Sequence, residues 1–322
     1  MVRGRAVSPK VGLFQEGSHR IVDVPRCLVH HPTINAVAAA AKTAIRETGA
    51  TAYADAPHRG AVRALQVVVE RATGQAQLVV VANAETPDAT AGLTTALASA
   101  LGPDLHSLWW NGNPARTNTI LGPHWARLAG EPAVCEAIGG ARVFFPPGAF
   151  GQANLPLADR LVAQVHAWVP HGADVVELYA GCGAIGLGLV ARAKRVAFNE
   201  VSPAGVDGLR MGIAALSPEG RARTAVLPGP ATACVDALAA ADVVILDPPR
   251  KGIDAAVLER LIAAPPARLI VVSCSLVAFL RESVALRGSG RWALRELVPF
   301  ALFPHTAHVE TVALFERRQR PG

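Results

Sequence analysis

One thiol and several carboxylates stand directly after short apolar runs in the second half of this 322-residue chain. Cys274 follows the run Leu269–Ser273, Glu200 ends the run Arg195–Glu200, and Asp247 opens the segment DPPRKG. A cysteine just before a helix can be a nucleophile, because the helix N-terminus stabilises its thiolate, although most buried cysteines are only small apolar side chains. A carboxylate such as Glu200 can accept hydrogen bonds from both hydroxyls of a ribose.

A glycine-rich segment, ELYAGCG at 177–183, follows another apolar run. Glycine allows the backbone to approach a ligand closely, and it also serves plain strand–helix turns. The segment does not contain the G-x-G-x-x-G pattern of a dinucleotide site, and Glu200 follows Gly183 by 17 residues. The loop and Glu200 together indicate a cofactor that contains a nucleoside but no pyrophosphate, such as S-adenosylmethionine.

Two further segments carry polar groups that could do chemistry. Pro248 and Pro249 fix φ and remove backbone donors, so they predict a rigid loop that aims Asp247 into a cleft. The segment FPHTAHVE, at 303–310, contains two histidines and a glutamate. Zinc would need further ligands, and no Cys/His pattern elsewhere supplies them, so we expect no metal. Glu310 is better interpreted as a general base, with the two histidines orienting it.

The elements that must position these residues alternate regularly after residue 140. The pattern predicts strands at 174–179, 195–200, 242–247 and 269–273, helices at 154–169, 184–192, from 202, 254–264 and 276–286, and a final antiparallel pair at 292–302 and 308–316. Strand–helix alternation of this kind is typical of an α/β fold with a doubly wound, mostly parallel Rossmann-like sheet and an antiparallel edge. In such a sheet, ligands bind at the carboxyl ends of the strands.

The regular alternation of strand and helix patterns is absent from residues 1–140, and this difference from residues 141–322 predicts two domains. We expect a small α+β domain at 1–140, with helices at 32–48 and 88–101, strands at 61–70 and 76–82, and irregular structure with a hairpin at 109–140. This domain is the expected RNA-recognition part if the partner is RNA.

Composition narrows the class of protein. The net charge is +6 and arginine supplies most of it, which suits phosphate contacts but equally suits a GC-rich genome. The five scattered cysteines argue against a disulfide framework and fit a reducing compartment. No secretory signal and no apolar run of membrane-spanning length is visible. We expect a cytoplasmic monomer that does not enter a membrane.

Six spaced segments together resemble the RNA uracil-C5 methyltransferase family, which uses S-adenosylmethionine to make 5-methyluridine in tRNA or large-subunit rRNA. FGQAN at 150–154 is similar to the family's F-x-Q-x-N, and LYAGCG at 178–183 to its D-[LF]-[FY]-C-G-x-G loop. Glu200 and DPPR at 247–250 match its cofactor glutamate and its D-P-P-R. The remaining two are Ser273-Cys274 with Arg281, similar to S-C-N-P-x-x-x-x-R, and HTAHVE at 305–310, similar to H-T-x-H-x-E.

The resemblance implies a role for each matching residue. Cys274 would be the nucleophile and Glu310 the base, while the cofactor would contact Gln152, Tyr179, Gly181, Gly183, Glu200 and Asp247, and the substrate would contact Phe150, Asp247 and Arg250. The chemistry needs these residue types, because uracil C5 becomes nucleophilic only after a thiolate adds to C6, and a base must then remove the C5 proton. The target uridine must also leave its stack, so the implied partner is a loop or a flipped nucleotide of RNA.

Departures from the family pattern bear on these expectations. Of the four N-terminal cysteines that cluster-binding members carry, only Cys27 is present, so we expect no iron–sulfur cluster. Some members carry an N-terminal RNA-binding β-barrel, and we expect none here. One alternative is a methyltransferase that acts on an exocyclic amine, but such enzymes favour an aromatic residue after D-P-P, where this chain has Arg250, and they need no thiol. Ser275-Leu276 stands in place of Asn-Pro, which leaves the alternative of a catalytically weak or inactive RNA-binding or chaperone protein that retains the fold.

Overall fold

The computed structural model describes residues 1–18 and 20–318, and the chain divides into two compact units, Met1–Glu136 and Ala137–Gly322. A two-stranded hairpin, β8 (Val134–Ile138) and β9 (Ala141–Phe145), contains the division. In the part of the chain that is described, no helix is long and apolar enough to cross a membrane.

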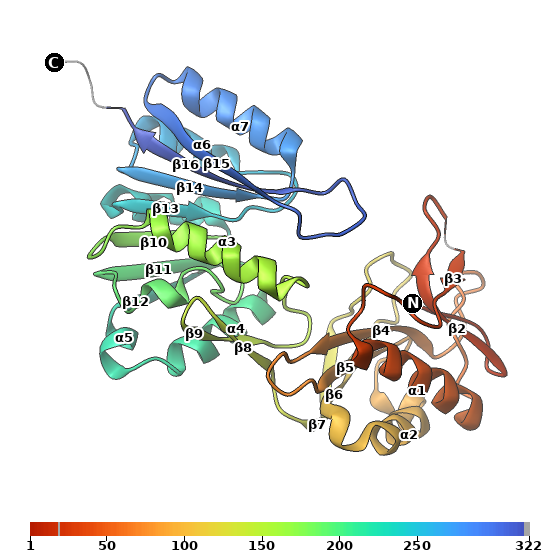
Figure 1. The fold of residues 1–322 in the computed structure, drawn as a ribbon. Coiled ribbons are helices and arrows are strands. Elements are labelled where there is room, and N and C mark those ends of the chain that lie inside the picture. The colour runs from red at the N-terminus through yellow and green to blue at the C-terminus, as the bar shows by residue number, and fades with distance from the viewer. Residues whose placement is uncertain (19, 319–322) are drawn as a thin grey trace. The chain divides into compact units, whose positions relative to one another are not determined.

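The described residues of the second unit form a seven-stranded sheet in the order β12-β11-β10-β13-β14-β16-β15 (Figure 1). The first five of these strands are parallel, and β16 and β15 form an antiparallel edge. The strands are β10 (Asp174–Leu178), β11 (Arg195–Glu200), β12 (Thr224–Pro228), β13 (Val243–Leu246), β14 (Arg268–Ser273), β15 (Trp292–Phe300) and β16 (Glu310–Arg317). The helices are α3 (Leu155–Trp168), α4 (Pro203–Ala214), α5 (Pro218–Ala222), α6 (Ala255–Ala263) and α7 (Leu276–Gly288), with 3₁₀ turns η3 (Leu187–Leu189) and η4 (Ala231–Ala240). The predicted doubly wound fold is confirmed.

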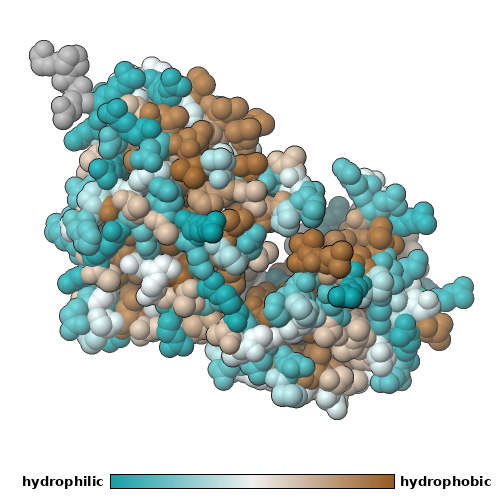
Figure 2. Space-filling view, in the orientation of Figure 1, coloured by the Kyte–Doolittle hydropathy of each residue, from teal (hydrophilic) through white to brown (hydrophobic). Residues whose placement is uncertain are grey.

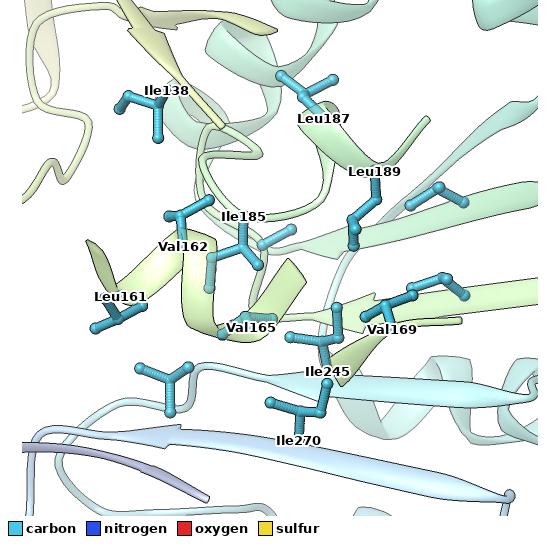
Figure 3. Close-up of a cluster of buried hydrophobic side chains, with 14 of the residues drawn as sticks. Ile138, Leu161, Val162, Val165, Val169, Ile185, Leu187, Leu189, Ile245 and Ile270 are labelled. Carbon is cyan, nitrogen blue, oxygen red and sulfur yellow. The ribbon is translucent and has the colours of Figure 1, made fainter. Parts of the chain in front are cut away.

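Both faces of this sheet are buried, because successive side chains of each strand enter different cores. On β13, Val243 and Ile245 belong to one core and Val244 and Leu246 to the other. Figure 3 shows the first core, which contains Leu161, Val162 and Val165 of α3 together with Ile245 and Ile270 of the sheet. Helices α6 and α7 contribute Val257, Leu261, Phe279 and Leu286 to the second core. Helices on both faces leave the strand ends free for a site.

The predicted helix at 184–192 is wrong, since only the 3₁₀ turn η3 forms there. Glycine costs a helix about 1 kcal/mol per residue relative to alanine, and Gly186 and Gly188 both lie in this stretch. A side chain at either position would also clash, at Gly186 with the Glu177 carboxylate and at Gly188 with the Gly139 carbonyl. These glycines serve close packing under the loop rather than a helix. The short strand β12 was not predicted.

The first unit contains a four-stranded sheet in the order β4-β5-β6-β7 and a three-stranded sheet β1-β2-β3 (Figure 1). Its strands are β1 (Val2–Arg5), β2 (Ser8–Phe14), β3 (Ile21–Asp23), β4 (Val62–Val69), β5 (Ala76–Ala82), β6 (Leu105–Gly112) and β7 (His124–Gly130). Its helices are α1 (Pro32–Thr48) and α2 (Ala91–Leu101), with 3₁₀ turns η1 (Pro87–Thr90) and η2 (Gly102–Asp104). The expected irregular segment from residue 109 is wrong at its start, because Trp109–Gly112 pair with both β5 and β7.

Helix α7 has an apolar face that no core covers. Leu276, Val277, Leu280 and Val284 are each more than half exposed, and Figure 2 shows hydrophobic surface (brown) over this helix. The opposite face buries Ala278, Phe279, Glu282, Ser283 and Leu286. Packing therefore holds α7 by one face only, and the exposed face starts two residues after Cys274.

Candidate active site

A cavity of about 850 Å³ lies at the carboxyl ends of the parallel strands in the second unit. Its wall contains every predicted site residue except Gly183, namely Phe150, Gln152, Tyr179, Gly181, Glu200, Asp247, Arg250, Cys274 and Glu310. These residues come from segments spread over 160 positions of the sequence, and parallel strand order brings them to one edge. Phe150 is 71% exposed, so this ring belongs to the surface of the site rather than to a core.

Gly183 does not line the cavity. Its φ is +81°, and a Cβ there would lie 2.7 Å from Leu209 Cδ1 and 2.9 Å from Leu187 Cγ. The residue therefore has to be glycine for the turn and for packing against Leu187 and Leu209.

Glu200 holds the glycine-rich loop through its carboxylate. Its Oε2 accepts a hydrogen bond from the Gly181 N–H at 2.7 Å, and its Oε1 accepts from the N–H groups of Val201 at 2.9 Å and Ser202 at 2.6 Å. The side chain is buried at the end of β11 and lines the cavity. Glu200 thus fixes the loop and the start of α4, where the Ser202 hydroxyl caps the helix.

Tyr179 connects the glycine-rich loop, residues 177–183, to the segment 247–254 that contains Pro248 and Pro249, here called the proline loop. Its φ is +61°, and its hydroxyl donates to Asp254 Oδ2 at 3.0 Å and accepts from the Asp254 N–H at 3.2 Å. Lys251 Nζ lies 2.7 Å from the other carboxylate oxygen of Asp254. Burial raises the pKa of Tyr179 to about 12, and the ion pair with Lys251 lowers the pKa of Asp254. Sequence reasoning missed Asp254, because nothing local connects it to a tyrosine 75 residues earlier.

Two side chains of α7, Arg281 and Glu282, form hydrogen bonds to the backbone of the proline loop. Glu282 is buried, and its Oε1 accepts a hydrogen bond from the Ile253 N–H at 2.8 Å. Arg281 donates to the Lys251 carbonyl at 2.8 Å and to Glu282 Oε1 at 3.0 Å. Arg281 therefore positions the loop that carries Asp247 and Arg250. Glu282 was not predicted, since a glutamate within a helix gives no signal of burial.

Cys274 and Glu310 come together through the pairing of β14 with β16. Ser273 is opposite Thr311 in this antiparallel pair, and the Thr311 hydroxyl donates to the Ser273 carbonyl at 3.2 Å. Cys274 directly follows Ser273 and Glu310 directly precedes Thr311, so both residues adjoin this last pair, and the Glu310 charge acts on the Cys274 thiol. Ser275 then caps α7 by accepting from the Ala278 N–H at 3.3 Å. The replacement of Asn-Pro by Ser275-Leu276 therefore leaves α7 with an ordinary helix start.

The cavity holds several carboxyl groups, and the pKa values of Glu310 and Asp247 are raised there. Burial raises the pKa of Glu310 to about 7. Burial, together with the negative charges of Glu310 and Glu200, raises the pKa of Asp247 to about 8. The pKa of Cys274 is raised by burial and by the charges of Glu310 and Asp247, while Arg250 acts in the opposite direction. Burial and the neighbouring carboxyl groups therefore act against the thiolate that a position at the start of α7 favours.

The two histidines do not orient Glu310. His308 lines the cavity and its ring stands edge-on to Phe303, 6.2 Å away between ring centres. His305 has a left-handed backbone with φ of +60° and lies outside the cavity wall. Among residues 1–18 and 20–318, neither ring hydrogen-bonds to Glu310, and no group of three or more His, Cys, Asp and Glu side chains could hold a metal ion.

Two oxygens in the cavity wall are buried without a hydrogen-bond partner among the described residues. They are Oε1 of Gln152 and Oε2 of Glu177. Glu177 is fully buried, and burial with the charges of Asp247 and Glu200 raises its pKa well above the usual range. Buried polar atoms in proteins normally have partners, so Gln152 Oε1 fits a ligand that brings an N–H donor, whereas Glu177 Oε2 lies against Gly186, whose backbone acts to lower the Glu177 pKa. The amino groups of S-adenosylmethionine are donors of that kind.

Comparison with known proteins identifies the family. No protein-family profile matches the chain. The chain is 36% identical over 322 residues to an uncharacterised RNA methyltransferase of Protochlamydia amoebophila, covering 98% of this chain and 84% of that protein. It is 32% identical over 330 residues to another from Geobacter sulfurreducens, covering 99% of this chain and 64% of that protein.

The fold is also that of a solved methyltransferase. The crystal structure of the tRNA (uracil-54, C5)-methyltransferase of Pyrococcus abyssi, in complex with S-adenosyl-L-homocysteine, matches with a TM-score of 0.80 at 23% sequence identity. The match covers 94% of this chain and 71% of that one. With a curated relative at 36% identity along nearly its whole length, this chain belongs to the family of RNA methyltransferases.

Proposed function

We propose that this protein transfers the methyl group of S-adenosylmethionine to C5 of a uridine in tRNA or rRNA. The observation that carries the proposal is the juxtaposition of Cys274 and Glu310, which adjoin the last pair of β14 and β16 and line one cavity. A thiol and a carboxyl group are the nucleophile and base that methylation at uracil C5 requires, and methyl transfer to an amine would require neither.

The cofactor would occupy the part of the cavity between the glycine-rich loop and the proline loop. Glu200 would accept from the ribose hydroxyls, and Gln152 Oε1, which has no partner among the described residues, would accept from an N–H donor. Tyr179 and Gly181 would line the same part of the site. When bound, S-adenosylmethionine supplies an electrophilic methyl group on a positively charged sulfur.

Cys274 and Glu310 would then divide the reaction on the uracil. Cys274, once deprotonated, forms an Sγ–C6 bond, and the electrons of the C5–C6 double bond move toward O4 as an enolate. C5 takes the methyl group with that electron pair. Glu310 next accepts the C5 proton, the C5–C6 double bond re-forms, and the Sγ–C6 bond breaks to return the thiolate. A pKa of about 7 suits Glu310 for this task near neutral pH.

Asp247 and Arg250 would act on the charges of these steps. With a pKa of about 8, Asp247 is mostly protonated at pH 7 and can donate a hydrogen bond to O4, where the enolate charge develops. Arg250 opposes the rise in the Cys274 pKa, which favours the thiolate. The exposed ring of Phe150 at the cavity wall offers a stacking surface for the flipped base.

Nucleoside mass spectrometry tests this function. Unmodified tRNA and rRNA transcripts are incubated with S-adenosylmethionine and wild-type protein, Cys274→Ala, or the matched control Cys135→Ala, whose thiol lies outside the cavity. We expect 5-methyluridine with the wild type and the control and none with Cys274→Ala. Glu310→Gln should accumulate a covalent protein–RNA adduct, seen as a band shift that survives denaturation. No product on either RNA, despite cofactor binding, would contradict the proposal and favour a role in RNA binding alone.

A further inference from the structure

The connection between β6 and β7 in the first unit is much longer than it needs to be. These strands are antiparallel neighbours, which a loop of about 2–5 residues can join, yet residues 113–123 lie between them. The segment, NPARTNTILGP, has no regular secondary structure. A long irregular loop in a compact unit usually has a function of its own.

Buried side chains hold this segment in one shape. Arg63 is 5% exposed, and its guanidinium donates to the carbonyls of Asn113 at 2.6 Å, Ala115 at 2.8 Å and Thr117 at 3.0 Å. It also stands over the Tyr53 ring, 4.5 Å from the ring centre. Among the described residues, Arg63 forms no ion pair with a carboxylate, although a buried charge is costly without one.

Further hydrogen bonds hold the rest of the segment. The Asn113 side chain donates to the carbonyls of Thr119 at 2.7 Å and Ile120 at 3.0 Å. Asn111 donates to the Gly122 carbonyl at 2.9 Å and accepts from its N–H at 2.7 Å. His58 Nε2 lies 2.9 Å from the Pro114 carbonyl. The backbone groups of the segment thus face inward onto side chains rather than onto solvent.

The outer side of the segment presents polar and positive groups. Every residue from Ala115 to Ile120 is exposed, including Arg116, Asn118 and Ile120. The segment contains no acidic residue, and the unpaired charge of Arg63 lies beneath it. The buried charge of Arg63 and the exposed charge of Arg116 both give this surface a positive potential, which attracts phosphate groups.

We propose that residues 115–120 are a docking surface for the substrate RNA. This inference rests on the proposed function in taking RNA as the substrate. Arg116 would contact a phosphate, Asn118 would hydrogen-bond to a base edge or a 2′-hydroxyl, and Ile120 would pack against an unstacked base. Arg63 and Asn113 already order the segment in the free protein. RNA binding therefore does not have to offset a loss of conformational entropy in this segment.

Binding measurements with exposed-residue variants test the proposal. Neither Arg116 nor Asn118 makes a side-chain hydrogen bond or ion pair within residues 1–18 and 20–318, so the double variant Arg116→Ala/Asn118→Ala should fold normally. The matched control is Arg46→Ala, an exposed arginine in the last turn of α1. Fluorescence anisotropy would give the Kd for tRNA and rRNA transcripts at several salt concentrations, and calorimetry would give the Kd for S-adenosylmethionine.

We expect the double variant to raise the RNA Kd roughly tenfold. The slope of log Kd against log salt concentration should fall by about 0.7–0.9, which corresponds to the loss of one phosphate contact. The control should stay within about twofold of the wild type, and cofactor affinity should not change in any variant. An RNA Kd of the double variant equal to that of the wild type overturns the inference, whether or not 5-methyluridine is formed. A wild type that binds no RNA also overturns it.

The same data separate this inference from the proposed reaction. If the wild type binds RNA without methylating it and the double variant loses affinity, residues 115–120 are the docking surface and the proposed reaction fails. A third variant, Arg63→Met, removes the donors that hold the segment but no exposed residue, and it should also weaken RNA binding. Unchanged RNA affinity in Arg63→Met would contradict the role of the preformed shape.

Discussion

Replacing Glu310 by glutamine should make the protein more stable at alkaline pH while abolishing turnover. Glu310 is buried at the start of β16, and burial raises its pKa from 4.5 to about 7. A carboxyl group with a raised pKa binds its proton more tightly in the folded state than in the unfolded state. Its contribution to stability is therefore present below the unfolded pKa near 4.5 and is lost as the pH rises through about 7.

The size of this effect follows from the shift. A change from 4.5 to about 7 corresponds to about 3 kcal/mol at 1.36 kcal/mol per pKa unit, and most of it develops between pH 4.5 and pH 8. Glutamine does not titrate, so Glu310→Gln should gain about that much over the wild type across this range. Asp247 adds to the gain, because the Glu310 charge is one cause of its own raised pKa.

Urea unfolding followed by circular dichroism, at pH 4.5 and at pH 8, measures this difference. The matched control is Glu259→Gln, which replaces an exposed glutamate of α6 that lies outside the cavity. A difference between Glu310→Gln and the wild type that does not change with pH would refute the reasoning. So would a variant that becomes less stable relative to the wild type as the pH rises.

Three further variants examine the support of the cavity. Glu200→Ala should weaken the binding of S-adenosylmethionine by tenfold or more and leave the Gly181 N–H without an acceptor; unchanged affinity by calorimetry would rule out the ribose contact. Gly186→Ala should lower the free energy of unfolding by about 1–3 kcal/mol, since the new methyl group meets the Glu177 carboxylate, and an unaltered Tm would contradict that packing. Tyr179→Phe should cost about 1 kcal/mol of stability by removing the hydrogen bond to Asp254, and urea unfolding without any loss would show that the bond contributes nothing.

The parts of the fold that were predictable are those where local pattern and tertiary packing agree. Helix α1 runs over the predicted residues 32–48, because its apolar spacing and its closing Gly49 both point to a helix there. The predicted helix at 184–192 did not form, because Gly186 and Gly188 fit close backbone contacts that only the tertiary structure reveals. Strand β6 was not predicted, since its pairing with β5 is a long-range feature.

In the candidate site, too, some residues could be predicted from the sequence and others could not. Residues at strand ends, such as Glu200, Asp247 and Cys274, could be foreseen around one cavity, because parallel topology places all carboxyl ends at one edge. Their supports could not, since Asp254 reaches Tyr179 and Glu282 reaches Ile253 only through the folded chain. The raised pKa values of Glu310 and Asp247 could not be predicted either, because they depend on burial and on the other carboxyl groups in the same cavity.

The pairing of β14 with β16 has a consequence for the order in which the site is assembled. Strand β16 lies between β14 and β15 in the sheet but comes last in the chain. During synthesis Cys274 is therefore in place before Glu310, and β15 cannot complete the sheet until β16 has inserted beside β14. A nascent chain at that stage would have a nucleophile without the group that allows its release. Insertion of β16 thus brings Glu310 next to the segment that carries Cys274 and gives β15 the neighbour it pairs with.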